Sequence, residues 1–142
     1  MKFTISVLFL FFALHTTAQP STLAGTYRLS IGKDFAHSID YNLTLNTDST
    51  FVFHSFSNAV KGIPPEVHIY GKGHWKAVKN IISFSTNTDN DISAKYSLDF
   101  NTTKGRYITK SLRDKSDREV NTRLQIYESK TRFLHGTELV KQ

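Results

Sequence analysis

Apolar and polar residues alternate with a period of two along most of this chain, which is the pattern of β-strands that bury one face. Near the C-terminus we expect a final short strand over 131–135, followed by a weaker apolar segment at Leu139 and Val140. No segment keeps a helical period for more than a turn or two, so the pattern predicts an all-β domain. The other alternating segments are 27–31, 39–45, 51–55, 66–77, 81–85, 96–100, 106–110 and 123–127.

The links between these segments are polar and mostly short. The stretch 57–65 contains Gly62 and the pair Pro64–Pro65. We expect it to be a long loop, because proline has no N–H to donate to a sheet. Tight turns are predicted at 46–49 and 79–80, and a hairpin at 101–105 leads into the strand 106–110. Eight or nine strands joined in this way predict an antiparallel meander that closes, wholly or in part, into a barrel.

Large aromatic residues gather on the predicted inner face of the strands. Burying each ring contributes roughly 1.5–3 kcal/mol, so their simplest role is to fill the core of a small barrel. In a wider barrel the same rings would line an apolar cavity, and Tyr27, Tyr41, Phe53 and Trp75 would be the candidate ligand-binding residues. The full inward set is Tyr27, Tyr41, Phe51, Phe53, Trp75, Tyr96 and Phe100.

The N-terminus has a different pattern. Lys2 precedes an apolar run from Ile5 to Leu14, and small residues follow at Thr16 and Ala18. The export machinery reads this order, and the run is too short to span a bilayer. We therefore expect a signal peptide over 1–18, a single domain over 19–142 without a membrane span, and a periplasmic or extracellular location. The chain has no cysteine, which excludes disulfides and thiolate chemistry.

Basic residues are concentrated in one stretch. Between 104 and 132 there are nine basic and four acidic residues. Such a stretch can attract an anionic partner, and outside a cell a polysaccharide, a lipid headgroup or an acidic protein is expected before a nucleic acid. The alternative interpretation is a solvated loop of mixed charge. The candidate anionic-partner residues are Lys104, Arg106, Lys110, Arg113 and Arg118.

No arrangement of residues identifies a reaction. No serine lies in a Gly-x-Ser-x-Gly context, and no glycine-rich phosphate loop occurs. Asp40 and Asp99 are predicted to face solvent, where nothing raises the pKa of a general acid. We therefore expect a non-catalytic protein without a cofactor.

Two of the histidines could form a pair. His68 and His74 lie about 20 Å apart on one extended strand, too far to share a metal. His54 would meet His68 across neighbouring strands if the stretch 57–65 folds back as a hairpin. Two imidazoles without a clear carboxylate partner fall short of a closed metal site, so no metal is expected. Tyr70, beside Lys72 and His74, marks a candidate contact patch on the outer face.

Four short motifs follow one another in the first half of the domain. They are Gly-Thr-Tyr at 25–27, Leu-Thr-Leu-Asn-Thr-Asp-Ser-Thr-Phe at 43–51, Gly-Lys-Gly-His-Trp-Lys at 71–76 and Asn-Ile-Ile-Ser-Phe at 80–84. Their order resembles that of small exported bacterial β-barrels of lipocalin-like type. The resemblance implies an architecture whose interior can hold a cavity, and it supplies no ligand. Ser49 stands where the family pattern has glycine, which indicates a different turn type.

Two functions are consistent with these observations. The first is an exported, non-catalytic protein that holds a small apolar or amphipathic ligand inside the barrel. The second is an envelope or extracellular interaction module with a filled core, which uses the basic stretch 104–132.

Overall fold

The computed structural model describes residues 21–32 and 36–142, and these residues form nine β-strands and one short helix. The signal peptide expected over 1–18 lies outside the described residues. Within them, no helix is long and apolar enough to cross a membrane. The elements are β1 (Gly25–Ile31), β2 (His37–Leu45), β3 (Thr50–Ala59), β4 (Glu66–Val78), β5 (Ile81–Ser85), α1 (Thr88–Asp91), β6 (Tyr96–Leu98), β7 (Lys104–Ile108), β8 (Arg123–Glu128) and β9 (Glu138–Lys141).

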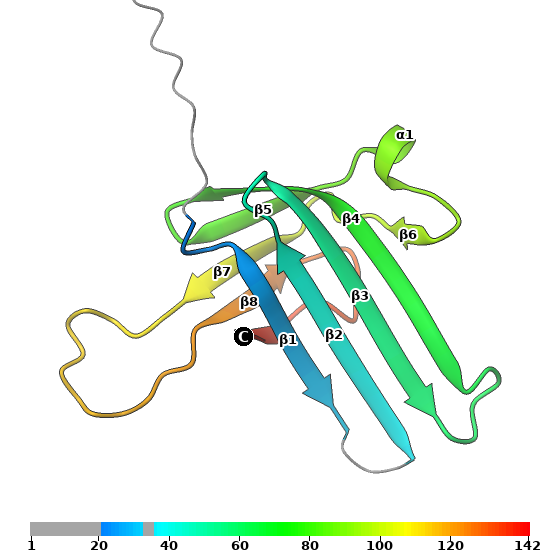
Figure 1. Cartoon of the computed structure of the whole chain (residues 1–142), viewed down its shortest axis with the longest axis horizontal. Coiled ribbons are helices and arrows are strands. Elements are labelled where there is room, and N and C mark those ends of the chain that lie inside the picture. The colour runs from blue at the N-terminus through cyan, green and yellow to red at the C-terminus, as the bar shows by residue number, and fades with distance from the viewer. Residues whose placement is uncertain (1–20, 33–35) are drawn as a thin grey trace, which may run out of the picture.

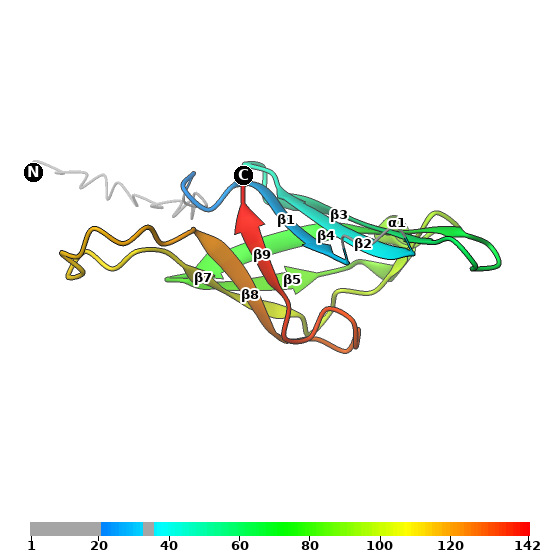
Figure 2. The same ribbon diagram turned by 90° about the horizontal axis from the view of Figure 1, so that it is seen from below.

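Eight of the strands close into an antiparallel barrel, which confirms the predicted fold class. Each strand from β1 to β4 pairs with the next, and β5 pairs with β7. The order continues through β8 and β9, and β9 pairs with β1. In Figure 1 the strands β1–β4 cross the front of the molecule. Figure 2 shows that β7, β8 and β9 form the opposite layer. β6 lies outside this ring and pairs in parallel with β4.

The hairpin between β2 and β3 is fixed by local hydrogen bonds. The carboxylate of Asp48 accepts hydrogen bonds from the backbone N–H and the hydroxyl of Thr50, at 2.9 and 2.6 Å. These bonds lower the pKa of the Asp48 carboxyl, because they stabilise its charged form. Ser49 adopts a left-handed backbone conformation, with φ of 70°. The predicted turn is therefore present, with serine in a conformation that glycine adopts more readily.

Two glycines let other groups approach the inner face of β4. A Cβ atom on Gly73 would lie 2.1 Å from the carbonyl oxygen of Ser85, and one on Gly71 would lie 2.4 Å from the ring of Phe100. Real side chains cannot make such contacts. The absence of a side chain thus brings β5 close to Gly73 and seats the Phe100 ring against Gly71.

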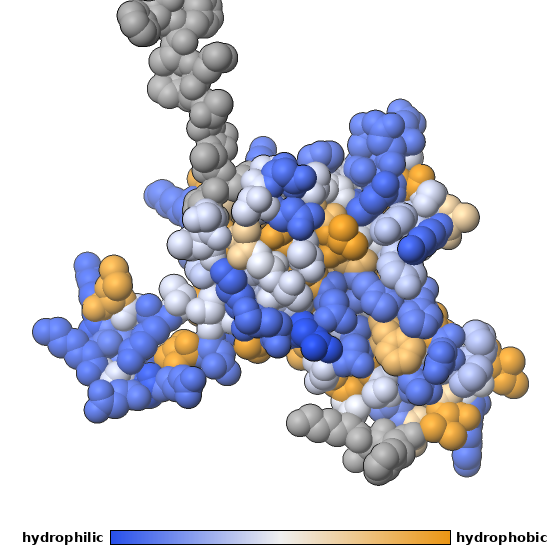
Figure 3. Space-filling model, in the orientation of Figure 1, coloured by the Kyte–Doolittle hydropathy of each residue, from blue (hydrophilic) through white to orange (hydrophobic). Residues whose placement is uncertain are grey.

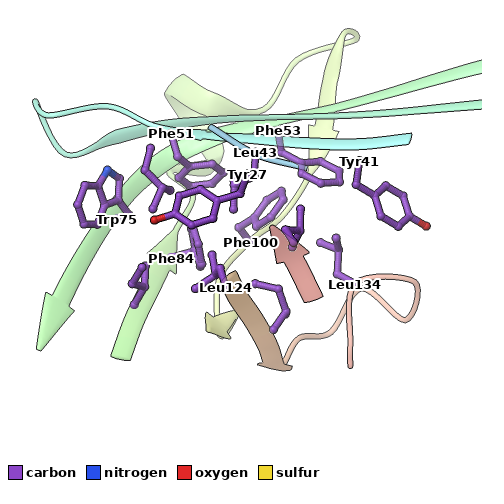
Figure 4. Packing of buried hydrophobic residues seen from close by; sticks show 14 of the residues in the cluster. Tyr27, Tyr41, Leu43, Phe51, Phe53, Trp75, Phe84, Phe100, Leu124 and Leu134 are labelled. Atoms are coloured by element: carbon purple, nitrogen blue, oxygen red, sulfur yellow. The ribbon is translucent and has the colours of Figure 1, made fainter. Parts of the chain in front are cut away.

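The barrel interior is filled with aromatic and aliphatic side chains (Figure 4). The ring of Phe51 packs edge-on against those of Phe84 and Phe100, with centroids 5.0 and 4.8 Å apart. Phe53 lies 5.5 Å from Phe100. Such edge-on and tilted arrangements are favourable for aromatic pairs and occupy the space between the two layers. Six of the seven aromatic residues predicted to face inward are buried: Tyr27, Tyr41, Phe51, Phe53, Trp75 and Phe100.

For the seventh, Tyr96, the prediction is wrong. It lies half-buried on β6, against Tyr70 on the outside of the barrel, with ring centroids 5.9 Å apart. The alternation over 96–100 is present, but the segment leaves the sheet after Leu98. Phe100 is buried in the interior, and the partly buried Leu98 packs against the core.

Three segments also differ from the prediction. β3 continues through Ala59 into the stretch expected to be loop, since His37 and Glu66 extend the ladders on both of its sides. The stretch 101–105 does not form a hairpin between neighbouring strands, because β7 pairs with β5 and β8 rather than with β6. The residues 131–135 form turns, and the last strand is β9.

Candidate functional site

The four residues predicted to line a ligand cavity are all buried in contact with protein. The hydroxyl of Tyr27 donates a hydrogen bond to the carbonyl of Leu23 at 2.5 Å, and burial, with the nearby Tyr107, raises the pKa of Tyr27. The indole N–H of Trp75 donates to the carbonyl of Asn46 at 3.0 Å. Their polar atoms are therefore bonded within the fold.

The other two residues lie toward one end of the core (Figure 4). Tyr41 packs 5.9 Å from Phe53 and 5.7 Å from Phe133, which closes over both rings from the segment between β8 and β9. Burial raises the pKa of the Tyr41 hydroxyl. A ligand at this position would have to displace these rings from one another.

Three hollows lie on the outside of the described structure. One of about 690 Å³ lies under the loop between β7 and β8, and one of about 660 Å³ lies where β2 meets the β3–β4 turn. A third, of about 200 Å³, lies over β4 and β5 and reaches Trp75. Tyr27, Tyr41 and Phe53 line none of the three.

The basic stretch does not form one positive surface. Lys104 and Arg106 lie on β7, whereas Lys110, Arg113 and Arg118 lie in the long loop that follows it. Most of these cations have partners. Lys104 pairs with Glu128 at 3.0 Å and Arg118 pairs with Asp114 at 2.8 Å, while the guanidinium of Arg106 lies 5.5 Å from the ring centre of Tyr127. The Lys110 ammonium donates to the carbonyl of Ser116, and Arg113 is exposed.

A different set of side chains gathers on the outer face of β3, β4 and β6, the three strands side by side at the right of Figure 1. We call this set the ring face; Figure 3 shows the surface of the molecule from the same side. None of its members is buried, and every ring contacts another. It consists of His54, Phe56, His68, Tyr70 and Tyr96, together with Lys72 and Lys95.

Strand register assembles the ring face. His54 lies directly opposite Tyr70, and Phe56 lies directly opposite His68, in the β3–β4 ladder. Tyr70 in turn lies opposite Tyr96 in the β4–β6 ladder. Directly opposed side chains on one face of a sheet are in contact. The predicted meeting of His54 and His68 is confirmed, with His54 Nε2 and His68 Nδ1 3.0 Å apart.

The lysines of the ring face have no acidic partner among the described residues, whose three ion pairs all lie elsewhere. The Lys95 ammonium lies 4.9 Å from the ring centre of Tyr70 and 5.4 Å from that of Tyr96. The Lys72 ammonium lies 5.1 Å from the ring of Tyr96. An ammonium held over aromatic rings keeps its charge available to an anion, because no carboxylate neutralises it.

A clamp at the base of the segment 86–101 holds β6 in place. The side chain of Asn101 donates to the carbonyl of Thr86 at 2.8 Å and accepts from its N–H at 3.0 Å. The hydroxyl of Thr86 accepts from the N–H of Phe100 at 2.9 Å. These bonds tie the two ends of the segment together, so α1 and β6 leave and rejoin the barrel at one place.

The environment of His54 on the ring face shifts the pKa of its imidazole. Partial burial lowers its pKa, and the nearby His68 and Lys95 lower it further. The groups around it include Tyr70 and Lys72 on β4 and Asp40 and Asn42 on β2, of which Asn42 lies directly opposite. At neutral pH the imidazole is therefore uncharged, which suits its hydrogen bond with His68.

This lowered pKa predicts a small loss of stability in acid. The unfolded chain binds the His54 proton at about pH 6.5 and the folded chain only at lower pH, so stability falls over that interval and then levels off. We expect a loss below about 1 kcal/mol, because solvent screens this half-exposed ring. Urea unfolding of the wild type and of His54→Asn between about pH 7.5 and pH 5 measures it. A pH titration of the His54 imidazole resonances by NMR that places its pKa at or above about 6.5 would contradict this prediction.

Parts of the ring face can be seen in the sequence and parts cannot. The sequence indicates Tyr70 and Lys72 as an outward patch, and His54 with His68 as a pair. It does not indicate Tyr96 and Lys95, because nothing local shows that a strand so far along the chain pairs in parallel with β4. The described residues contain no group of three or more metal-ligating side chains.

Comparison with known proteins adds no relative: no family model matches the chain, and no match was found among curated proteins or solved structures.

Proposed function

We propose that this protein is an exported, non-catalytic binding module that captures an anionic partner on the outside of a filled barrel, at the ring face. The observation that carries the proposal is the pair of lysines, Lys72 and Lys95, held over tyrosine rings without a carboxylate partner among the described residues. Unneutralised cations on a rigid surface attract anions and steer their approach.

The two functions suggested by the sequence have less support. A ligand inside the barrel would need space that Tyr41, Phe53 and Phe133 occupy together. The basic stretch has its cations divided between a strand and a loop, and Lys104 and Arg118 are neutralised by acids. The ring face combines free charge with side chains that are held in place by their neighbours, so less conformational entropy is lost on binding there.

Charge reversal on the ring face should weaken anion binding strongly. We expect Lys72→Glu/Lys95→Glu to bind immobilised heparin about ten-fold more weakly than the wild type, since each exposed charge contributes up to about 1 kcal/mol. Elution from heparin along a sodium chloride gradient, together with titration of soluble heparin at low salt, measures the change. Wild-type binding should also weaken steeply with salt, because exposed charges are screened within about 8 Å at physiological ionic strength.

Two matched pairs of variants serve as controls. Lys79→Glu/Lys130→Glu makes the same charge change at two exposed lysines, one in the turn after β4 and one after β8, and should cost much less. Arg113→Glu/Arg118→Glu reports on the basic stretch. If that variant loses heparin binding while the Lys72/Lys95 variant keeps it, the site is wrong. If fatty acids or sterols quench Trp75 emission while heparin leaves the protein unbound, the interior function replaces this one.

A further inference from the structure

The rings of the ring face form a continuous ladder across three strands. Consecutive centroids lie 4.8 Å apart from Phe56 to His68, 5.2 Å from His68 to His54, and 4.5 Å from His54 to Tyr70. The last step, from Tyr70 to Tyr96, is 5.9 Å. Contact along the whole ladder fixes the rings relative to one another. Exposed aromatic side chains arranged in this way present a wide surface at little entropic cost.

The ladder is amphipathic rather than purely apolar. The ring of Phe56 and the ring of Tyr70 supply apolar surface. Beside them lie the Tyr70 hydroxyl, the His54 imidazole and the Lys72 ammonium. A pyranose has the matching character, with C–H bonds on its faces and hydroxyl groups around its edge. Sugar faces pack on aromatic rings, and sugar hydroxyls bond to the neighbouring polar groups.

The charge on the ring face is sparse. Two lysines accompany five rings, and His54 is uncharged at neutral pH. Nucleic acid binding depends on many cations along a closely charged phosphate backbone. A polymer that has a sugar ring in every unit and carboxylates in place of a phosphate backbone fits two cations beside five rings better.

Resting on the function proposed above, we infer that the ligand of the ring face is an acidic polysaccharide, whose sugar rings pack along the ladder while its carboxylates pair with Lys72 and Lys95. Export would place the protein where such polymers occur. The rings would supply selectivity among anions, and the lysines would supply the attraction that brings the chain to the surface.

The test compares polymers that share a charge but differ in rings. Titration calorimetry should show that wild-type protein binds polygalacturonate about ten-fold more tightly than poly-L-glutamate at equal carboxylate concentration, because the polypeptide lacks sugar faces. Tyr96→Ala and, separately, Tyr70→Ala should lower affinity for polygalacturonate roughly five- to ten-fold. Affinity for poly-L-glutamate should fall clearly less, because that polymer uses only the lysines and not the ring surface. Tyr70→Phe, which keeps the ring, should retain most of the affinity.

Tyr127→Ala is the matched control, since Tyr127 is a half-exposed tyrosine beside Arg106 on another part of the barrel. It should leave both affinities unchanged. Equal binding of the two polymers, or tighter binding of an oligothymidylate, would overturn the polysaccharide while anion capture stands. Failure of the wild type to bind any of these polymers or heparin would overturn both. Near-ultraviolet circular dichroism of each variant confirms that Tyr96→Ala, which lies outside the barrel, is folded.

Discussion

Replacing Gly73 by alanine should destabilise the barrel by about 2–3 kcal/mol, a large share of the stability of a small domain. The added Cβ would lie 2.1 Å from the carbonyl oxygen of Ser85 and 3.0 Å from the ring of Phe51. The carbonyl belongs to the backbone of β5 and cannot move without disturbing the β4–β5 ladder. Urea unfolding, followed by the emission of the neighbouring Trp75, measures the change in the free energy of unfolding.

Gly105→Ala is the control for that variant. Its new Cβ would meet Leu124 Cδ1 at 2.8 Å, which is the end of a side chain and can shift more easily than the backbone carbonyl that opposes Gly73. We expect a loss clearly smaller than for Gly73→Ala. Equal losses for the two variants would mean that the close approach of β4 and β5 is not what requires glycine at position 73.

Removing the Phe100 ring should cost about 3–5 kcal/mol, which is more than truncation of any side chain on the outer face of the barrel. The ring packs against Phe51, Phe53 and Phe84 and lies on Gly71, so Phe100→Ala leaves a cavity in the middle of the core. Thermal and urea unfolding measure the loss. If the variant is still folded at low temperature, it should also bind heparin more weakly, because Phe100 anchors the segment that carries Tyr96 and Lys95.

Phe56→Ala makes the same chemical change on the outer face of β3. Its ring is half-exposed and packs against the ring of His68, so we expect a loss below about 1 kcal/mol. A loss for Phe100→Ala as small as that for Phe56→Ala would show that the interior relaxes around the missing ring. The core would then be adaptable rather than rigidly packed, and an interior ligand would regain support.

The barrel can be predicted from the sequence because the patterns that specify it, alternation and turn residues, lie close together along the chain. Alternation places Tyr41, Phe53 and Trp75 inside, and polar pairs such as Lys79–Asn80 mark the turns. The neighbours of the strands β1 to β5 therefore follow from chain order. The same reasoning misplaces the last strand. The segment 131–135 consists of turns that cover the core, and its apolar residues Phe133 and Leu134 pack there without being part of a strand.

The site is less accessible to prediction than the fold. Tyr96, Leu98 and Phe100 alternate as an inward strand would, but the Thr86–Asn101 clamp and the parallel pairing with β4 are long-range features. Charge counting likewise points to 104–132, because a sequence does not show which lysines and arginines meet a carboxylate. The cations that matter most for the proposal, Lys72 and Lys95, stand out by the absence of an acid near them among the described residues rather than by their number.

The hydrogen bonds that tie the two ends of the segment 86–101 together have a consequence for how this barrel can vary. The eight barrel strands close into a ring without this segment, since β5 pairs directly with β7. The residues of this segment that lie away from the core, unlike Leu98 and Phe100, can thus change in number and identity while the scaffold is retained. Exchange of that outer part is a route by which the protein acquires a new binding preference.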